Sequence, residues 1–477
     1  MRRASIVIVG GGIAGLSAAW ELTGAKDGPS DDSPRVELIE ADSRVGGVLQ
    51  TTQFAGRTID LGADGFLARR PEAVALIGEL GRSNELEAID ASGASLWLRG
   101  SLNELPTGLM LGVPTSSGQL TDVKGLSLRA RLDAARDQRL PVRMNVGNDA
   151  TIGDIVRTKL GRELAYQFIE PMVGGIQAGR IDQLSAKSVF PALLTAAQQG
   201  GSLMKALRLA AASAPESSGP IFNSLVDGVG SLPLELAEQL RARGVVLRTG
   251  VAVTALRRTP SGSYPWEVDT AATTTPADAV VLATPAPTVA RLLGSLDPAL
   301  ERLSSITSAG AAVITFSAPR ADVTLSAAGT GVLVPLGTPW SGDGSMMVTA
   351  LTFLDRKWSH LRREDDVLLR AHVGRIDDAR WTQMSDEELT ERVASEMRVL
   401  LPRFEGTYSS LVQRWPAGLP QYYLGHDTLV RNAKVGAAAL HVTLCGNAYD
   451  GVGIPASIGS GRRAGREALD MVRASAR

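Results

Sequence analysis

The apolar residues near the start of the chain follow two successive patterns. Residues 5–9, Ser-Ile-Val-Ile-Val, form a short β-branched run that is typical of a buried strand. Three glycines follow, and apolar residues then recur with helical spacing over residues 13–23. After a polar loop, residues 36–40 predict a second strand. We therefore predict a β-α-β unit with parallel strands and a right-handed connection.

The pattern changes twice further along the chain. Residues 81 to about 211 are rich in Leu, Ala and Arg in amphipathic stretches such as 126–139 and 152–168, which predict mainly helix. Strand and helix patterns then alternate again. The elements predicted there are a glycine turn at 228–230, a helix over 232–243, a strand around 245–247 and a buried strand over 279–283. Because the α/β pattern recurs in separated pieces, we expect interleaved domains.

Residues 300–410 predict a mixed segment. Strand-like runs cover residues 311–316, 331–334 and 346–353. One helix is well marked, because Ser385 and Glu388 form a capping-box pattern and apolar residues follow it at helical spacing.

Composition excludes several classes of protein. The chain has 477 residues with 49 Lys+Arg against 50 Asp+Glu, so it offers no basic field for a nucleic acid. The single cysteine, Cys445, cannot form an internal disulfide, and the four histidines lack the spacing of zinc ligands. We predict no bound metal. The 51 glycines exceed the roughly 33 of an average chain of this length, so their positions matter.

The N-terminus superficially resembles an export signal. Met1-Arg2-Arg3 precedes the apolar run 6–9, but the glycines at 10–12 interrupt this run at once. No stretch reaches the roughly 18 apolar residues of a membrane-spanning helix. We predict a cytoplasmic protein, with a weak membrane-surface contact as an alternative because residues 126–139 carry arginines beside apolar positions.

The first glycines match a dinucleotide-binding fingerprint. Gly10-x-Gly12-x-x-Gly15 follows a predicted strand and opens a predicted helix. Gly10 allows the tight turn, Gly12 lets a pyrophosphate approach, and Gly15 allows close helix–strand packing, while the helix N-terminus attracts the phosphates. Glu40 ends the second strand and can bind a ribose diol; its charge would repel a 2′-phosphate, which argues against NADP.

Two further glycine-rich segments help to decide whether the bound dinucleotide is FAD or NAD. Arg44 and the pair Gly46-Gly47 lie just beyond Glu40, where charge and bare backbone could meet the same diphosphate. Glycines at 446, 451 and 453 precede Pro455 and a small-residue helix that runs to residue 471; its N-terminus could stabilise negative charge on a reduced flavin. The alternatives are that residues 44–47 form a plain surface loop and that the C-terminal helix only packs on the core.

Several motifs together give the chain a family resemblance. The fingerprint, residues 44–47, 60–66 and 451–455 resemble the FAD-binding segments of the amine-oxidase-like flavoproteins. Residues 66–71, 170–179, 414–415, 419–422 and 425–426 fall in the order found in the bacterial protoporphyrinogen/coproporphyrinogen oxidases. The resemblance covers nearly the whole chain. Gly65, Gln177 and Arg180 depart from it, standing where relatives often carry serine, tyrosine and aspartate.

The resemblance implies an α/β fold in which a Rossmann-type FAD-binding domain interleaves with an α+β substrate domain and a helical lobe. The implied FAD-binding parts are residues 1–65, 223–290 and 411–477; the substrate parts are 66–90, 196–222 and 291–410; the lobe is 91–195. One non-covalent FAD per chain is implied. The implied FAD-binding residues are Gly10, Gly11, Gly12, Ile13, Ala14, Gly15, Glu40, Ala41, Arg44, Gly46, Gly47, Gly62, Ala63, Asp64, Val253, Trp415, Val452, Gly453 and Ile454.

The resemblance also implies a reaction: six-electron oxidation of a porphyrinogen by FAD and dioxygen in haem biosynthesis, with release of hydrogen peroxide. No side-chain base is assigned. The implied substrate-binding residues are Arg70, for a propionate, and Gly175, Ile176 and Trp358. We favour coproporphyrinogen III; protoporphyrinogen IX, an amine, a carotenoid, or a flavin-free NAD-binding module remain alternatives. A downstream haem-pathway enzyme is an implied partner.

Overall fold

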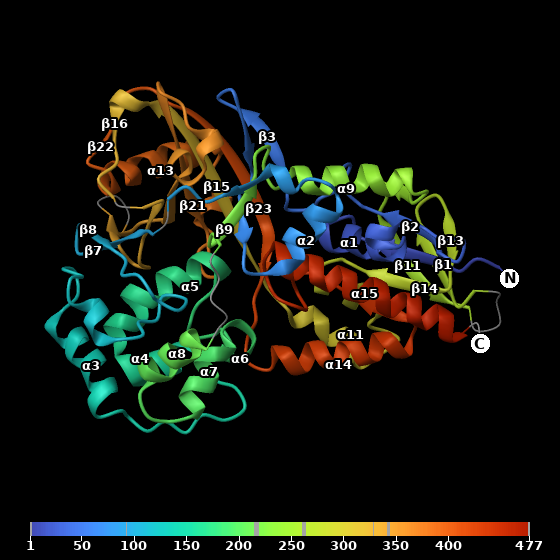
Figure 1. Cartoon of the computed structure of the whole chain (residues 1–477), viewed down its shortest axis with the longest axis horizontal. Helices are drawn as coiled ribbons and strands as arrows, with labels where there is room; N and C mark the ends of the chain where they lie inside the picture. The colour runs from blue at the N-terminus through green and yellow to red at the C-terminus, as the bar shows by residue number, and fades with distance from the viewer. Residues whose placement is uncertain are drawn as a thin grey trace.

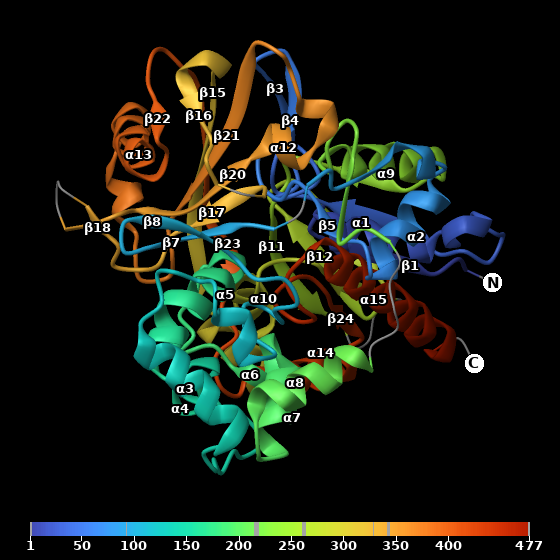
Figure 2. The same cartoon turned by 60° about the vertical axis from the view of Figure 1, so that its left-hand side comes forward.

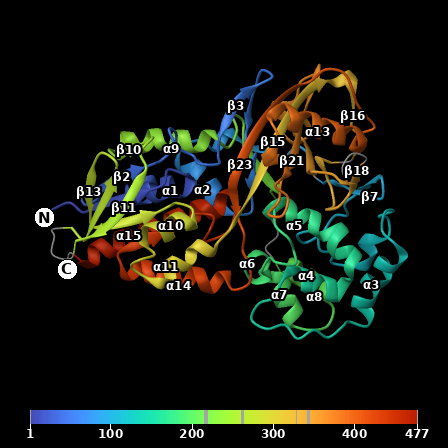
Figure 3. The same ribbon diagram turned by 180° about the vertical axis from the view of Figure 1, so that it is seen from behind.

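The computed structural model describes residues 2–91, 93–213, 219–259, 264–327, 329–340 and 344–475. It has three parts (Figure 1): a parallel sheet with its helices on the right, a larger sheet at the upper left, and a helical part at the lower left. Both termini lie at the same far end of the first part. Figure 3 shows the same three parts from behind.

The first part contains a five-stranded sheet in the order β10-β2-β1-β14-β24, and every neighbouring pair is parallel. Its strands come from distant segments: β1 (Ser5–Val9), β2 (Arg35–Ile39), β10 (Val246–Arg248), β14 (Ala279–Leu282) and β24 (Val442–Leu444). With α1 (Ile13–Leu22) between β1 and β2, the predicted parallel β-α-β unit is confirmed. This strand order is that of doubly wound nucleotide-binding sheets.

Both faces of this sheet are buried, as expected for parallel strands. Ile6 and Ile8 of β1 pack with one core cluster, whereas Val7 and Val9 pack with another. The first cluster includes residues of α1, α2 (Pro71–Glu79), α9 (Ser231–Ala242) and α15 (Ile454–Ser475). The second includes residues of β11 (Val253–Arg258), β12 (Trp266–Thr270), β13 (Thr274–Ala277), α10 (Ala286–Leu293), α11 (Pro298–Glu301) and α14 (His426–Ala439).

Helices α1 and α15 approach each other closely at small residues. A Cβ added at Gly461 of α15 would lie 2.0 Å from the carbonyl oxygen of Ala14 in α1. One at Gly465 would lie 2.7 Å from the carbonyl oxygen of Ala18. The glycines of the C-terminal helix therefore bring the two ends of the chain together, as the red and blue helices of Figure 1 show.

The second part is a seven-stranded mixed sheet in the order β23-β15-β21-β20-β17-β7-β8. Its strands are β23 (Ser409–Pro420), β15 (Ser308–Pro319), β21 (Asp366–Val373), β20 (Val348–Phe353), β17 (Gly331–Leu333), β7 (Ser95–Leu98) and β8 (Ser101–Glu104). The predicted strands at 311–316, 331–334 and 346–353 are confirmed. So is the capped helix, α13 (Asp386–Leu400), in which Ser385 and Glu388 form the capping box.

The block 81–211 is mainly helical, as predicted, but three strands among its described residues were missed. They are β6 (Leu86–Ala88) and the two strands of the β7–β8 hairpin. β7 pairs parallel with β17, so its register depends on a strand more than 200 residues away. Local periodicity carries no signal for such a partner.

The third part contains the helices of the block 81–211, of which only the stretches 126–139 and 152–168 were located in the sequence. They are α3 (Leu128–Arg139), α4 (Ile152–Leu160), α5 (Glu170–Gln177), α6 (Ala186–Val189), α7 (Pro191–Gln198) and α8 (Leu203–Ala212). The predicted helix over 152–168 is broken, because Gly161 has a φ of +86° and a π-helical turn, Leu164–Ile169, follows. The other strands and helix of the described residues are β3 (Thr51–Phe54), β4 (Arg57–Asp60), β5 (Phe66–Leu67), β9 (Phe222–Leu225), β16 (Val323–Thr324), β18 (Pro339–Trp340), β19 (Gly344–Ser345), β22 (Arg403–Phe404) and α12 (Leu354–Lys357).

Candidate functional site

The carboxyl ends of β1 and β14 meet where the strand order reverses. The Ala283 amide after β14 donates to the Val9 carbonyl at 2.8 Å. Gly10 leaves β1 with a φ of +106°, and a Cβ there would lie 2.5 Å from the Ala283 oxygen. Ligands of open α/β sheets bind in the crevice at this position. The turn at Gly10 therefore opens toward the expected nucleotide site.

The N-terminus of α1 offers a cradle of bare backbone. Gly12 is the N-cap and no side chain caps the helix, which leaves backbone N–H groups and the positive end of the helix dipole for an anion. A Cβ built on Gly12 meets no atom within 4 Å, whereas one on Gly15 would lie 2.0 Å from the Gly10 oxygen. Gly15 thus lets the helix start close to the strand, and Gly12 leaves room for a phosphate.

Glu40 lies beside this cradle. One carboxylate oxygen accepts the Gly11 N–H at 2.5 Å and the other accepts the Asp42 N–H at 2.7 Å. A carboxylate has about four acceptor positions, so capacity remains for a diol. The Gly46 amide donates to the Gly11 oxygen at 2.8 Å, and Arg44 donates to the Gly47 oxygen at 2.8 Å. Arg44 and Glu40 therefore fix the two loops that face the helix N-terminus.

The C-terminal glycine segment joins the same edge after β24. Gly446, Gly451 and Gly453 have φ values between +112° and +122°, and Gly446 and Gly453 leave open space where a Cβ would stand. The Tyr422 hydroxyl accepts the Gly451 N–H at 3.1 Å and donates to the Asn447 oxygen. Tyr422 belongs to the family motif at residues 419–422, but its hydrogen bonds to this segment were not predicted.

The predicted segment 62–64 is held by a buried polar network. Asp64 accepts hydrogen bonds from Lys357 at 2.7 Å and from the indole of Trp358 at 3.2 Å. Burial alone would raise the pKa of Asp64, but Lys357 and Arg370 outweigh it and hold this pKa well below its usual range. The carboxylate is therefore charged, and Trp358 is 1% exposed and packs against Gly65.

Arg370 and Trp415 hold the backbone just before Asp64. Arg370 is 1% exposed and donates to the carbonyls of Asp60 and Gly62, the latter at 3.2 Å. The Trp415 indole donates to the Leu61 oxygen at 3.1 Å. Sequence reasoning missed Arg370, although an arginine inside the apolar run 367–371 was a usable signal, since buried charges need partners.

Acid should destabilise the protein through His372, which shares this network on β21. Burial, then Arg370, lowers the pKa of His372 to about 4 from its ordinary 6.5. The pKa of His372 is lower in the folded state than in the unfolded state, so the unfolded state binds the proton more readily. The stability of the fold is therefore fully present above pH 6.5 and falls by up to about 3 kcal/mol as pH drops toward 4. Urea unfolding of wild type and His372→Gln at neutral and acidic pH measures this. The wild type should lose more stability on acidification; equal losses would refute the assignment.

The residues implied for substrate lie in different environments. Arg70 is the N-cap of α2, and its guanidinium pairs with Glu72 at 2.8 Å. Gly175 is exposed, and Ile176 of α5 is 48% exposed, which is unusual for an isoleucine. Val253, which the resemblance implies for FAD, is buried at the start of β11. Their contacts with a cofactor or substrate stay predictions.

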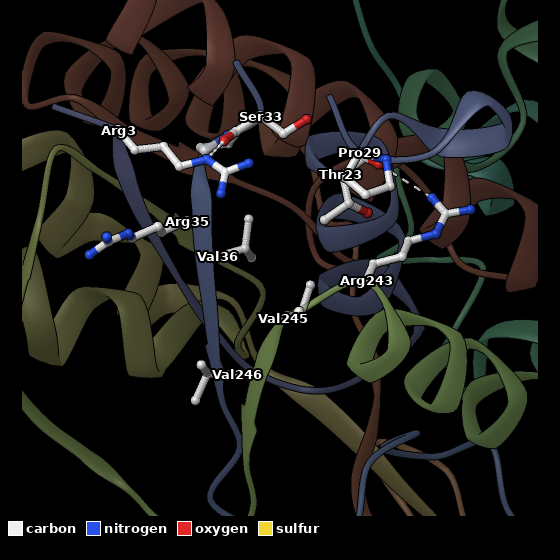
Figure 4. Close-up of a pocket in the computed structure, with 11 residues that line it drawn as sticks. Arg3, Thr23, Pro29, Ser33, Arg35, Val36, Arg243, Val245 and Val246 are labelled. Atoms are coloured by element: carbon white, nitrogen blue, oxygen red, sulfur yellow. Dashed lines mark hydrogen bonds between the residues drawn. The ribbon is translucent and has the colours of Figure 1, made fainter. Parts of the chain in front are cut away.

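A pocket of about 330 Å³ lies elsewhere on the same sheet (Figure 4). Arg3, Arg35 and Arg243 line it, together with Val36 and Val246. These residues stand at or near the amino ends of β1, β2 and β10, opposite the glycine cradle. The pocket therefore lies at the amino ends of the strands, whereas the expected nucleotide site lies at their carboxyl ends.

The described part of the chain offers neither a metal site nor a reactive thiol. No group of three or more His, Cys, Asp or Glu side chains there could hold a metal ion. Cys445 is fully buried, and burial raises the pKa of its thiol to about 12, so it is not a reactive thiolate. Among the same residues, no helix is both long and apolar enough to cross a membrane.

Comparisons with known proteins agree along the whole chain. A family model described as flavin containing amine oxidoreductase matches residues 13–469. The coproporphyrinogen III oxidase of Bacillus subtilis is 31% identical, with 97% of each chain covered. Human protoporphyrinogen oxidase is 28% identical over 96% of this chain and 97% of its own. A crystal structure from Exiguobacterium sp. 255-15, provisionally named protoporphyrinogen oxidase, matches with a TM-score of 0.85 and 29% identity, covering 98% of this chain and 100% of the other.

Proposed function

The chain belongs to the flavin containing amine oxidoreductases and, among them, to the bacterial porphyrinogen oxidases, and from this premise we propose that it oxidises coproporphyrinogen III to coproporphyrin III in haem biosynthesis. The family is that of a flavin-dependent oxidoreductase. The observation that carries the choice of substrate is the match to relatives named coproporphyrinogen III oxidase, at 31–32% identity over 96–97% of this chain. The 28% match to a protoporphyrinogen oxidase makes protoporphyrinogen IX the second candidate.

We propose FAD, bound non-covalently, as the cofactor. The open Cβ positions at Gly12 and Gly453 and the uncapped start of α1 fit a diphosphate, and Glu40 fits a ribose diol. The buried, protonated thiol of Cys445 does not favour a covalent link. Bound FAD would supply the redox chemistry: it would accept hydride from the macrocycle, and dioxygen, taking up two electrons and two protons, would reoxidise it and become hydrogen peroxide.

The protein's own residues bind and orient in this proposal. The N-terminus of α1 holds the diphosphate, and Arg44 keeps the 46–47 loop against it. The N-terminus of α15 stabilises negative charge by its dipole. Asp64 keeps its charge through Lys357 and Arg370, which fixes the backbone of residues 62–64. No side-chain base is needed, since a pyrrole proton can pass to water or a backbone oxygen.

For the substrate, we propose that the macrocycle lies over Gly175 and Ile176, whose exposure leaves an apolar surface open. Trp358 is too deeply buried for broad contact and acts through Asp64. Arg70 can form two hydrogen bonds with a propionate once the propionate displaces Glu72 from its guanidinium.

Arg70→Ala should raise the KM for coproporphyrinogen III about tenfold and that for protoporphyrinogen IX less, because coproporphyrinogen III carries additional propionates. Steady-state kinetics with both substrates measures this. Glu72→Gln is the matched control, which frees Arg70 and should not raise either KM. Equal effects of Arg70→Ala on both substrates would sink the propionate assignment.

The proposed function is tested by cofactor extraction followed by an aerobic assay. The released flavin should be FAD, and coproporphyrinogen III should give fluorescent porphyrin with three peroxides per macrocycle, since six electrons leave in pairs. Amines should give no peroxide. A colourless protein that stays colourless with FAD would instead favour a flavin-free NAD-binding module, and peroxide from amines would favour an amine oxidase.

A further inference from the structure

The guanidinium of Arg375, which contacts helix α5, is buried without a hydrogen-bond partner among the described residues. Arg375 follows Gly374 at the end of β21 and is 3% exposed. None of its three side-chain nitrogens has a hydrogen-bond partner among the residues that the structure describes. Burying an unpaired charge is strongly unfavourable, so a residue of this kind calls for a ligand.

The guanidinium lies flat against a glycine of α5. A Cβ built on Gly174 would lie 2.7 Å from Nη2 and 3.1 Å from Nη1 of Arg375. The backbone after it is fixed, because the Ile376 amide donates to the Ala178 oxygen at 2.8 Å. Gly174 therefore takes no side chain in order to admit the charged group beside the helix.

The next residue of α5 has few neighbours. A Cβ on Gly175 would meet only Leu333, at 3.8 Å, and both Gly175 and Ile176 are exposed. α5 packs against β17 and β20 of the seven-stranded sheet, as Figure 2 shows near the centre of the molecule. Gly175 therefore presents bare backbone at the surface, next in the chain to Gly174, which covers Arg375.

The neighbouring acids attract Arg375 through space, but none of them makes a hydrogen bond to it. Glu170 accepts from Arg180 at 2.6 Å, Arg180 also pairs with Asp377 at 2.7 Å, and Asp378 pairs with Arg380 at 2.7 Å. In the described part of the chain, no carboxylate lies within 4 Å of Arg375, the distance at which an ion pair is counted. The cluster thus offers one unpaired cation, whose matching ligand is an anion with two acceptor oxygens.

We propose that Arg375 binds a carboxylate arm of the substrate that enters beside Gly175. The arm is one that is a propionate in coproporphyrinogen III and a vinyl group in protoporphyrinogen IX, so Arg375 selects between the two. This inference rests on the proposed function.

The test is Arg375→Met, a replacement of similar length without charge. It should raise the KM for coproporphyrinogen III at least tenfold, leave kcat within twofold and leave the KM for protoporphyrinogen IX unchanged. The melting temperature of the unliganded variant should stay level or rise, because an unpaired buried charge is removed. Arg375→Lys should restore part of the affinity. Arg363→Met, at an exposed arginine, is the matched control.

A readout without turnover separates this inference from the proposed function. Fluorescence titration with coproporphyrin III, which keeps all four propionates, should show weaker binding to Arg375→Met than to wild type. If wild type oxidises no porphyrinogen, the proposed function fails, whatever the titration gives. If wild type oxidises it, but Arg375→Met binds coproporphyrin III as tightly as wild type, affects both substrates equally, or unfolds, then Arg375 is structural or solvated and the inference is overturned.

Discussion

A Gly12→Asp variant should fold normally and purify without flavin. The space beside Gly12 is open, because a Cβ there would meet no atom within 4 Å. It would, however, place a carboxylate where we propose the diphosphate, at the N-terminus of α1. Charge repulsion and lost space together should weaken FAD binding at least a hundredfold, about 3 kcal/mol. The flavin absorbance of the purified protein and titration of the apoprotein with FAD measure this.

Gly147→Asp is the matched control for this variant. Gly147 also has open space where a Cβ would stand, but it lies in the loop before α4, far along the chain from the cradle. The control should keep its flavin, and both variants should melt as apoproteins near the wild-type apoprotein. Full flavin content in Gly12→Asp would contradict the placement of the diphosphate.

The largest loss of stability is expected from Gly461→Ala. The added methyl group would lie 2.0 Å from the Ala14 oxygen, and backbone cannot yield as a flexible side chain does. Separating α1 from α15 should cost about 3 kcal/mol or more, and it should also displace the two helix N-termini that we propose meet the flavin. Urea unfolding followed by circular dichroism measures the stability.

Gly459→Ala, two residues earlier on α15, is the control. Its methyl group would lie 3.2 Å from Cγ of Glu72, a side chain that can move, so the expected cost is below about 1 kcal/mol. Similar losses for the two variants would show that close packing at Gly461 does not hold the helices together.

The nucleotide-binding part of the fold was predictable because its signals are local. The apolar runs 5–9 and 36–40 indicate strands by their own composition, and the glycines between them indicate a turn. None of these signals depends on a distant part of the chain. Gly10 and Gly15 mark a turn and a close approach, and the structure places both as expected. The order of the five strands, β10-β2-β1-β14-β24, was not predicted, because β10, β14 and β24 come from segments far from β1 in the sequence.

The substrate-facing part was less predictable because its contacts are distant in sequence. β23 has half-exposed residues along most of its length, so it lacks the strict alternation that marks a strand. Asp64 meets Lys357, and Arg370 meets the carbonyl of Gly62, each across about 300 residues. Such partners follow from the sheet topology, which no local pattern contains.

Anaerobic mixing of the purified protein with coproporphyrinogen III, followed by oxygen, tests the central claim most directly. We expect the flavin absorbance to bleach without oxygen while porphyrin fluorescence rises. Oxygen should then restore the flavin and release hydrogen peroxide. A bound flavin that coproporphyrinogen III leaves oxidised, under conditions in which dithionite reduces it, would contradict the account.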